Sequence, residues 1–342
     1  MVTTTDDAGF ERLRQKAAEL RTRGPRGRYA PSPTGPLHLG NARSALLAWL
    51  LTRLQGGTFA LRMEDLDQPR VRSGSARQIV QDLRWMGLDW DEGPDVGGPL
   101  GPYDQSARDD LYRTALQVLK DRDLVFPCYC SRKDIAQAAS APHGRSPVYP
   151  GTCRDLAPDA RVAAAARHPD RTPAWRLRVD DALIAMEDGV YGEFSQSMSE
   201  DVGDFVLRRA DSLFAYQLAV VIDDGLMGIT DVLRGFDLLD SSPRQIYLFR
   251  VFGFPIPTFW HVPLMLDEAG NRLSKRDGSD SIAQYRDRGV EAPHLVGLLA
   301  ASIGLVESGR ELTARELLHE STLSTFQERL QRVADTHSKN NS

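Results

Sequence analysis

A turn crowded with proline and glycine restricts most strongly how this chain can fold. It is the stretch APSPTGPLHLGN at residues 30–41, which follows a strand-like GRYA and runs into an apolar, helix-like segment over 42–54. A second strand, within GGTFALRMEDLD, and helices over 75–88 and 107–122 are expected next. This alternation predicts a parallel sheet with helices on its faces, in which ligands bind at the carboxyl ends of the strands.

The turn also has the residues of a nucleotide site. His38, Gly40 and Asn41 lie where the helix is expected to begin, and the free N–H groups of a helix start attract anions. The His38 imidazole could donate to a phosphoryl oxygen, while Gly40 would let a nucleotide approach the backbone. The alternative is a simple helix cap with a histidine in solvent. Neither G-x-x-x-x-G-K-[ST] nor G-x-G-x-x-G occurs in the chain.

One lysine stands out because lysine is scarce. Of 42 basic residues only five are lysine, and Lys275 lies in NRLSKRDGS, after an apolar strand and a turn. Such a loop could carry an ammonium group onto a phosphate. A solvated basic loop is the alternative for this motif taken alone. Together, an early histidine turn and a late lysine loop are a more specific indication of a nucleotide site than either motif alone.

Three cysteines lie within 26 residues, as Cys128-x-Cys130 and Cys153. Their odd number argues against a disulfide framework and favours a reducing cytoplasm. Three thiolates prefer zinc, so residues 126–155 are predicted to be a zinc-binding insertion. Three unrelated buried cysteines are the alternative. General ligand chemistry favours His143 as the fourth ligand.

Composition adds limits on the class of protein. With 342 residues, 41% of them hydrophobic and a net charge of −5, the chain fits a soluble protein with one large domain plus attachments, or two domains. A global charge of this sign still allows a local RNA-binding surface. No signal peptide or membrane span is expected, and residues 1–27 are predicted to be a helical extension. We expect residues 291–342 to be helical with a disordered tail, and the protein to be a cytoplasmic monomer.

Several segments together resemble the glutamyl branch of the class I aminoacyl-tRNA synthetases. They are RYAPSPTGPLHLGNARSALL, LRMEDLD, GLDWDEGP, VLRGFDLLDSSPRQIYL and RLSKR, in consistent order over residues 28–290. HLGN stands where those enzymes carry His-Ile-Gly-His, with Asn41 in place of the second histidine. RLSKR stands where those enzymes carry Lys-Met-Ser-Lys-Ser, with Arg276 in place of the final serine. The resemblance implies a Rossmann-like catalytic domain over 28–290 that forms an aminoacyl-adenylate from ATP and Mg²⁺.

The same resemblance implies roles for individual residues. His38 and Lys275 would be catalytic, and His38, Gly40, Asn41, Ser274 and Lys275 would bind ATP. An L-glutamate pocket is implied at Arg28, Tyr29, Ala30, Pro31, Ser32, Glu64, Tyr216 and Arg234. Arginine suits a carboxylate because its planar fork donates two parallel hydrogen bonds, and Glu64 would face the ammonium group. Each has a plainer alternative: the arginines as surface ion pairs, and Glu64 as a partner of Arg62.

The cysteine spacing resembles shortened members of this branch. Their zinc site is Cys-x-Cys…Tyr-x-x-x-Cys, which implies Tyr149 as fourth ligand, with His143 still a competitor. Only 66 residues follow Arg276, too few for a large anticodon-binding domain, so we expect none. The shortened members transfer glutamate to the queuosine base at the wobble position of tRNA(Asp), which implies that anticodon stem-loop as partner. The alternatives are a glutamyl-tRNA synthetase that charges the 3′ end of tRNA(Glu), and a non-catalytic zinc-bearing RNA-binding module.

Overall fold

A four-stranded parallel sheet forms the centre of the fold. The computed structural model describes residues 5–131, 133–135, 148–167, 172–265 and 280–340. In this part of the chain the sheet has the order β2–β1–β8–β9, built from β1 (Arg26–Tyr29), β2 (Thr58–Leu61), β8 (Asp231–Gly235) and β9 (Thr258–Val262). All three neighbouring pairs are parallel, as the alternation of strands and helices predicted.

The strand order creates a crevice between β1 and β8. From β1 the chain passes through α2 (Leu39–Leu54) to β2 on one side, whereas from β8 it passes through α8 (Ser242–Phe252) to β9 on the other. Chain segments that diverge from two adjacent strands leave a hollow outside the carboxyl ends of those strands. The turn over 30–41 therefore opens at the position where such sheets bind ligands.

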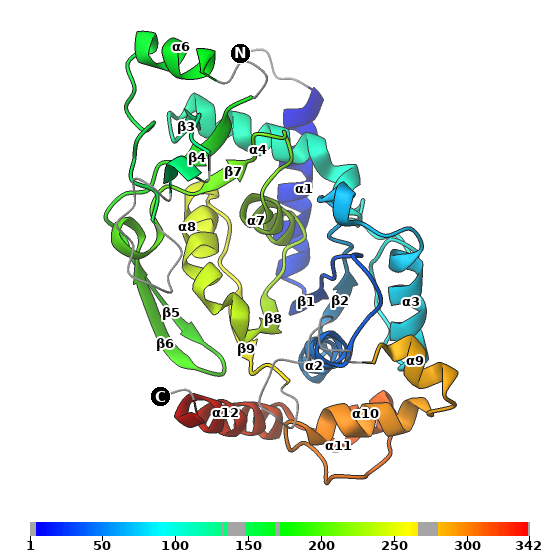
Figure 1. The fold of residues 1–342 in the computed structure, drawn as a ribbon. Helices are drawn as coiled ribbons and strands as arrows, with labels where there is room; N and C mark the ends of the chain where they lie inside the picture. The colour runs from blue at the N-terminus through cyan, green and yellow to red at the C-terminus, as the bar shows by residue number, and fades with distance from the viewer. Residues whose placement is uncertain (1–4, 132, 136–147, 168–171, 266–279, 341–342) are drawn as a thin grey trace.

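Helix α2 is buried on nearly all sides. Eleven of its sixteen residues are buried, because the helix is packed between the sheet and the C-terminal helices. Those helices are α10 (Ala292–Ala301), α11 (Ala314–Glu320) and α12 (Leu323–Asn340), which lie beneath α2 in Figure 1, where α2 is seen end-on. A helix that is apolar all round is stable only when it is covered in this way.

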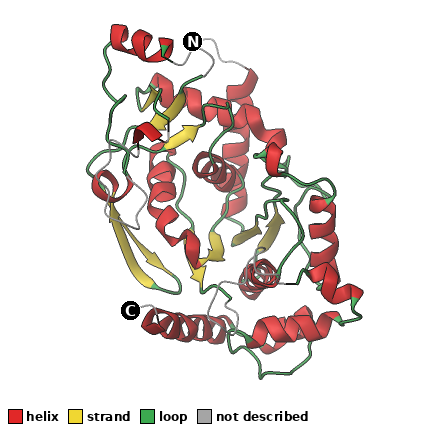
Figure 2. Cartoon of the chain, in the orientation of Figure 1, coloured by secondary structure: helices red, strands yellow, loops and turns green. Residues whose placement is uncertain are grey.

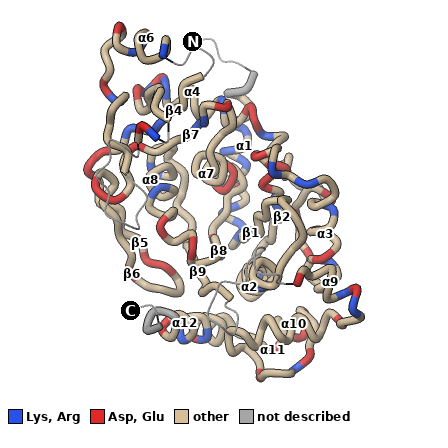
Figure 3. The backbone as a smooth tube through the Cα atoms, in the orientation of Figure 1, with Lys and Arg blue, Asp and Glu red and all other residues tan. Residues whose placement is uncertain are grey.

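Three further helices, α1 (Thr5–Arg21), α4 (Asp109–Asp121) and α7 (Tyr216–Leu226), pack against one another beside the sheet (Figure 2). Their apolar residues share a cluster with Val232 of β8 and Phe259 of β9. Helix α1 belongs to the predicted extension over 1–27, and it buries Phe10 and Ala17 in one of the two large apolar clusters, against α4 and α7. The predicted boundary after residue 27 falls inside β1. Acidic and basic residues are both spread over the described part of the chain (Figure 3).

Smaller elements complete the molecule. A three-stranded antiparallel sheet contains β3 (Val125–Cys128), β4 (Ala174–Leu177) and β7 (Val206–Arg208), and a hairpin joins β5 (Leu183–Asp188) to β6 (Gly192–Ser197). The remaining helices are α3 (Ser75–Trp85), α6 (Pro158–Ala166) and α9 (Ile282–Asp287). Short helical turns are η1 (Gln68–Arg70), η2 (Gln105–Arg108), η3 (Met198–Val202) and η4 (Phe236–Ser241). Within the described ranges, no helix combines the length and apolar character needed to cross a bilayer.

Candidate active site and metal site

A cavity of about 830 Å³ lies at the carboxyl ends of the parallel strands. Every residue predicted for the glutamate pocket lines it, as do three residues predicted for ATP: Arg28, Tyr29, Ala30, Pro31, Ser32, Glu64, Tyr216, Arg234, His38, Gly40 and Asn41. These residues follow or belong to β1, β2, β8 and the starts of α2 and α7. The fold thus brings residues more than 200 positions apart, such as Arg28 and Arg234, to one cavity.

The start of α2 forms one side of this cavity. His38 is the N-cap, with extended backbone angles of φ −105° and ψ 165°, and its carbonyl accepts the N–H of Ala42 at 2.9 Å. A methyl group added to Gly40 would meet no atom within 4 Å, so this backbone borders open space in the cavity. A helix start that faces a hollow in this way suits a phosphate, because its N–H groups and dipole favour negative charge.

The described residues on either side of the predicted lysine loop lie at the cavity or beside the histidine turn. Ser274 and Lys275 lie outside the described residues. The chain before them reaches the cavity wall at Leu264 and Met265. After them, Ser281 forms a β-bridge with His38, and the N–H of Ile282 donates to the carbonyl of Leu37 at 2.8 Å. The segment therefore begins at the lining of the cavity and ends beside the turn that carries His38.

A buried charge network underlies the other side. Arg28 Nε donates to Asp224 at 3.3 Å, and Arg62 Nη1 donates to the same carboxylate at 2.7 Å. Arg62 Nη2 also donates to Glu64 Oε1 at 3.1 Å, so Glu64 pairs with Arg62 and lines the cavity as well. Burial raises the pKa of Glu64, against the influence of Arg62 and Arg28. Burial also opposes ionisation of Asp224, but the two arginines outweigh it and lower the pKa of Asp224.

Asp223, the neighbour of Asp224, extends this network away from the cavity lining. It accepts hydrogen bonds from Arg108 Nε at 2.6 Å, Gln105 Nε2 at 2.7 Å and the Tyr112 hydroxyl at 2.9 Å. Arg62 Nε lies 3.6 Å from its Oδ2. Sequence reasoning missed these residues. Two adjacent aspartates inside the apolar segment LAVVIDDGL were the available signal, because buried carboxylates need partners.

Arg234 is a buried cation whose hydrogen-bond partners among the described residues are neutral. Its exposure is 6%, and it donates to His261 Nε2 at 3.0 Å, Gln245 Oε1 at 2.7 Å and Ser242 Oγ at 2.8 Å. Among the described residues, no aspartate or glutamate forms an ion pair with it. Burial lowers the pKa of Arg234. Since a buried charge without a counter-ion is costly, this wall of the cavity favours a ligand carboxylate.

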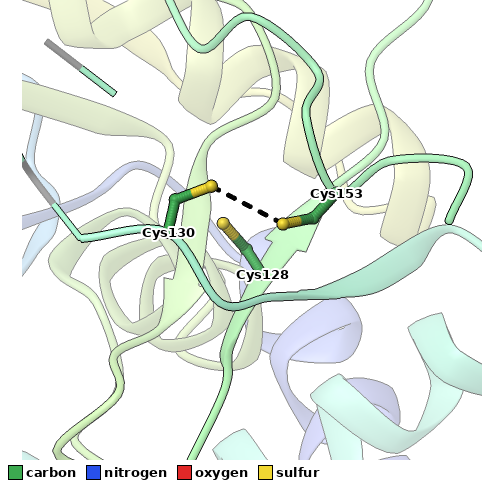
Figure 4. A group of neighbouring side chains, drawn as sticks. All are labelled: Cys128, Cys130 and Cys153. Carbon is green, nitrogen blue, oxygen red and sulfur yellow. Dashed lines mark hydrogen bonds between the residues drawn. The ribbon is translucent and has the colours of Figure 1, made fainter. Parts of the chain in front are cut away.

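The three cysteines form a compact cluster at the end of β3. Their sulfur atoms all lie within 4.8 Å of one another, and Cys130 Sγ and Cys153 Sγ are 3.6 Å apart (Figure 4). The Tyr149 hydroxyl points into the group, 3.4 Å from Cys128 Sγ and 3.9 Å from Cys130 Sγ. His143 lies outside the described residues.

This donor set fits zinc. Sulfurs bound to one tetrahedral zinc at about 2.3 Å are about 3.8 Å apart, close to the Cys130–Cys153 separation. Burial and the neighbouring sulfurs raise the pKa of Cys130 to about 12, so a cation is needed for several of these thiols to ionise together. Cys128, Cys130 and Cys153 could therefore hold a metal, with the Tyr149 oxygen adjacent.

Comparisons with known proteins show which family this chain resembles. A model of the family "tRNA synthetases class I (E and Q), catalytic domain" matches residues 26–338. The glutamyl-Q tRNA(Asp) synthetase of Symbiobacterium thermophilum is 52% identical over 85% of this chain and 90% of its own. The glutamate–tRNA ligase of the same organism is 43% identical over 87% of this chain and 63% of its own.

A solved structure shows the same fold. The glutamate tRNA ligase from Elizabethkingia meningosepticum, in complex with its amino acid, superposes with a TM-score of 0.75 at 30% identity. The match covers 88% of this chain and 65% of that one.

Proposed function

The chain belongs to the glutamyl-Q tRNA(Asp) synthetase family, a branch of the class I tRNA synthetases for glutamate and glutamine, and from this we propose its reaction. It activates L-glutamate with ATP and transfers the glutamyl group to the queuosine base at the wobble position of tRNA(Asp). The observation that carries the proposal is the convergence of Arg28, Glu64 and Arg234 on one cavity beside the start of α2. Two cations and one carboxylate match the two carboxylates and one ammonium group of glutamate.

The first step needs positioning and charge neutralisation rather than a general base. The ionised α-carboxylate of glutamate attacks the α-phosphorus of ATP, and pyrophosphate leaves as glutamyl-adenylate forms. Arg28 and Arg234 hold the carboxylates and Glu64 the ammonium group. His38, Gly40 and Asn41 at the start of α2 face the phosphates, with Ser274 and Lys275 contributing from the loop. Mg²⁺ enters with ATP.

In the second step a hydroxyl of the acceptor attacks the acyl carbon of the adenylate. An ester forms, AMP leaves and the hydroxyl proton is released. The anticodon stem-loop of tRNA(Asp) is the proposed partner, because the bases of a single-stranded loop can be splayed out for recognition. We also propose that the protein works as a monomer and that the reaction takes place in the cytoplasm, where its substrates occur. We further propose that Cys128, Cys130, Tyr149 and Cys153 hold one Zn²⁺.

ATP–pyrophosphate exchange across the amino acids, without tRNA, tests the first step. Glutamate should support exchange far better than aspartate or glutamine. The second step is tested with labelled glutamate and tRNA(Asp) with or without queuosine. Label should travel with the anticodon loop after nuclease cleavage and be absent without queuosine. Equal charging of tRNA(Glu) at its 3′ end would instead identify a glutamyl-tRNA synthetase, and a protein without adenylate formation would be a binding module.

A further inference from the structure

We propose that Asp188 and His261 form a positioning relay that holds the Arg234 guanidinium in place for a substrate carboxylate. The inference rests on the proposed function, in which Arg234 binds glutamate. Asp188 Oδ2 lies 2.6 Å from His261 Nδ1, and His261 Nε2 lies 3.0 Å from Arg234 Nε. All three side chains are buried, with exposures of 3%, 0% and 6%.

The hydrogen bonds assign the histidine tautomer. Arginine carries only donors, so His261 Nε2 must accept the Arg234 Nε–H, and the ring proton must reside on Nδ1. That N–H then donates to Asp188, which has only acceptors when ionised. Burial lowers the pKa of His261, which keeps the ring neutral and preserves this acceptor.

Asp188 is itself held from three sides. Its Oδ1 accepts the backbone N–H groups of Val190 and Tyr191 at 3.0 Å and that of His261 at 3.2 Å. Asp188 ends β5, and the next residue locks the hairpin against β9: the N–H of Gly189 donates to the carbonyl of Phe259 at 2.8 Å. A Cβ on Gly189 would lie 2.3 Å from the Trp260 ring, so only glycine allows this approach.

The relay orients Arg234 without neutralising it. A carboxylate in direct contact with the guanidinium would offset part of its charge, as Asp224 does at the Nε edge of Arg28. Here the imidazole stands between Asp188 and Arg234, and the other acceptors, Gln245 and Ser242, are also neutral. The guanidinium is thus fixed in geometry while its charge stays available to the ligand.

Asp188→Asn tests the relay through the tautomer. The amide oxygen can keep the backbone N–H partners, which turns the amide NH₂ toward Nδ1 and moves the ring proton to Nε2, opposite the Arg234 Nε–H. The same exchange in a catalytic triad leaves the wrong tautomer. We expect the KM for glutamate in pyrophosphate exchange to rise at least tenfold, with the KM for ATP within twofold of wild type. ¹⁵N NMR should find the His261 proton on Nδ1 in the wild type and on Nε2 in the variant.

Two further variants separate positioning from folding. Asp231→Asn changes another buried carboxylate, at the opposite end of β8, where it accepts from Trp260 Nε1 at 3.0 Å, and should leave both KM values unchanged. His261→Gln supplies a neutral acceptor without a tautomer, so adding Asp188→Asn to it should raise the glutamate KM less than twofold further.

Three results would overturn the relay: a proton on Nε2 in the wild type, an unchanged glutamate KM in Asp188→Asn, or equal rises in both KM values. Failure of the proposed function looks different, because wild-type protein would then show no glutamate-dependent exchange at all. The NMR measurement needs no activity and judges the relay in either case.

Discussion

Arg28 donates its Nε–H to both carboxylate oxygens of Asp224, with N···O distances of 3.3 and 3.4 Å. Both side chains are buried. The pairing engages the Nε edge of the guanidinium, while the residue still lines the cavity. Arg62 binds the same aspartate from another direction. Arg28 is therefore a preorganised cation whose orientation is set before any substrate enters.

Arg28→Gln should weaken glutamate activation strongly. The substrate carboxylate would lose its charged partner in a buried site, a cost on the order of 3 kcal/mol or about 100-fold in kcat/KM for glutamate. Pyrophosphate exchange measures the loss. Arg113→Gln removes an exposed arginine of α4 and should have no effect. Activity within threefold of wild type would remove Arg28 from the site.

Glutamate binding should weaken as the pH falls, and the weakening should begin at a higher pH than an exposed glutamate side chain would cause. Burial raises the pKa of Glu64, and only its ionised form attracts the substrate ammonium group. As pH falls through that raised pKa, Glu64 gains a proton and the KM for glutamate rises. An exposed glutamate would do so near pH 4.3. Glu64→Gln should bind glutamate more weakly and lose this acid limb; the same limb in wild type and variant would assign it to another group.

Gly40→Ala should change stability and activity in opposite directions. Its added methyl meets open space, and alanine stabilises a helix by up to about 1 kcal/mol relative to glycine. The same methyl would occupy the approach of the nucleotide, so the KM for ATP should rise at least tenfold. Gly9→Ala in α1, also with open space, is the matched control for stability alone. Thermal unfolding and exchange kinetics give the two readouts, and an unaltered ATP KM would contradict the nucleotide role.

Lys275→Ala should leave the free energy of unfolding unchanged within about 0.5 kcal/mol, because surface loop lysines contribute little. Pyrophosphate exchange should nevertheless fall on the order of 100-fold if the ammonium group neutralises transferring phosphate charge. Lys16→Ala, an exposed lysine of α1, serves as control. A change below about threefold would show a merely solvated loop.

The cysteine cluster should carry one zinc per chain by elemental analysis. Cys128→Ser combined with Cys130→Ser should remove it and lower the melting temperature, because metal binding is coupled to local folding. Tyr149→Phe should weaken zinc affinity at least tenfold, whereas His143→Ala should not. The reverse order would make His143 the fourth ligand, and metal-free wild-type protein with three freely titrating thiols would rule out the site.

Local sequence patterns were sufficient to predict much of this fold. The strand, turn and helix around His38 predicted the parallel sheet correctly, because hydrophobic periodicity and turn chemistry act over a few residues. Boundaries were less exact: the helix expected over 75–88 ends at Trp85, and the second strand covers only Thr58–Leu61. The resemblance also implied glutamate- and ATP-binding residues that all line one cavity wherever the structure describes them.

Only the tertiary structure decided which charges meet. Arg28 and Asp224 are 196 residues apart, and Asp188 and His261 are 73 apart, so no local pattern links either pair. The sequence alone left Arg28 and Arg234 open as surface ion pairs, whereas the fold buries both and gives a carboxylate partner to Arg28 and only neutral described partners to Arg234. The physical reason is that the charge state and geometry of a buried group depend on everything packed around it, and packing brings together strands and helices from distant parts of the chain.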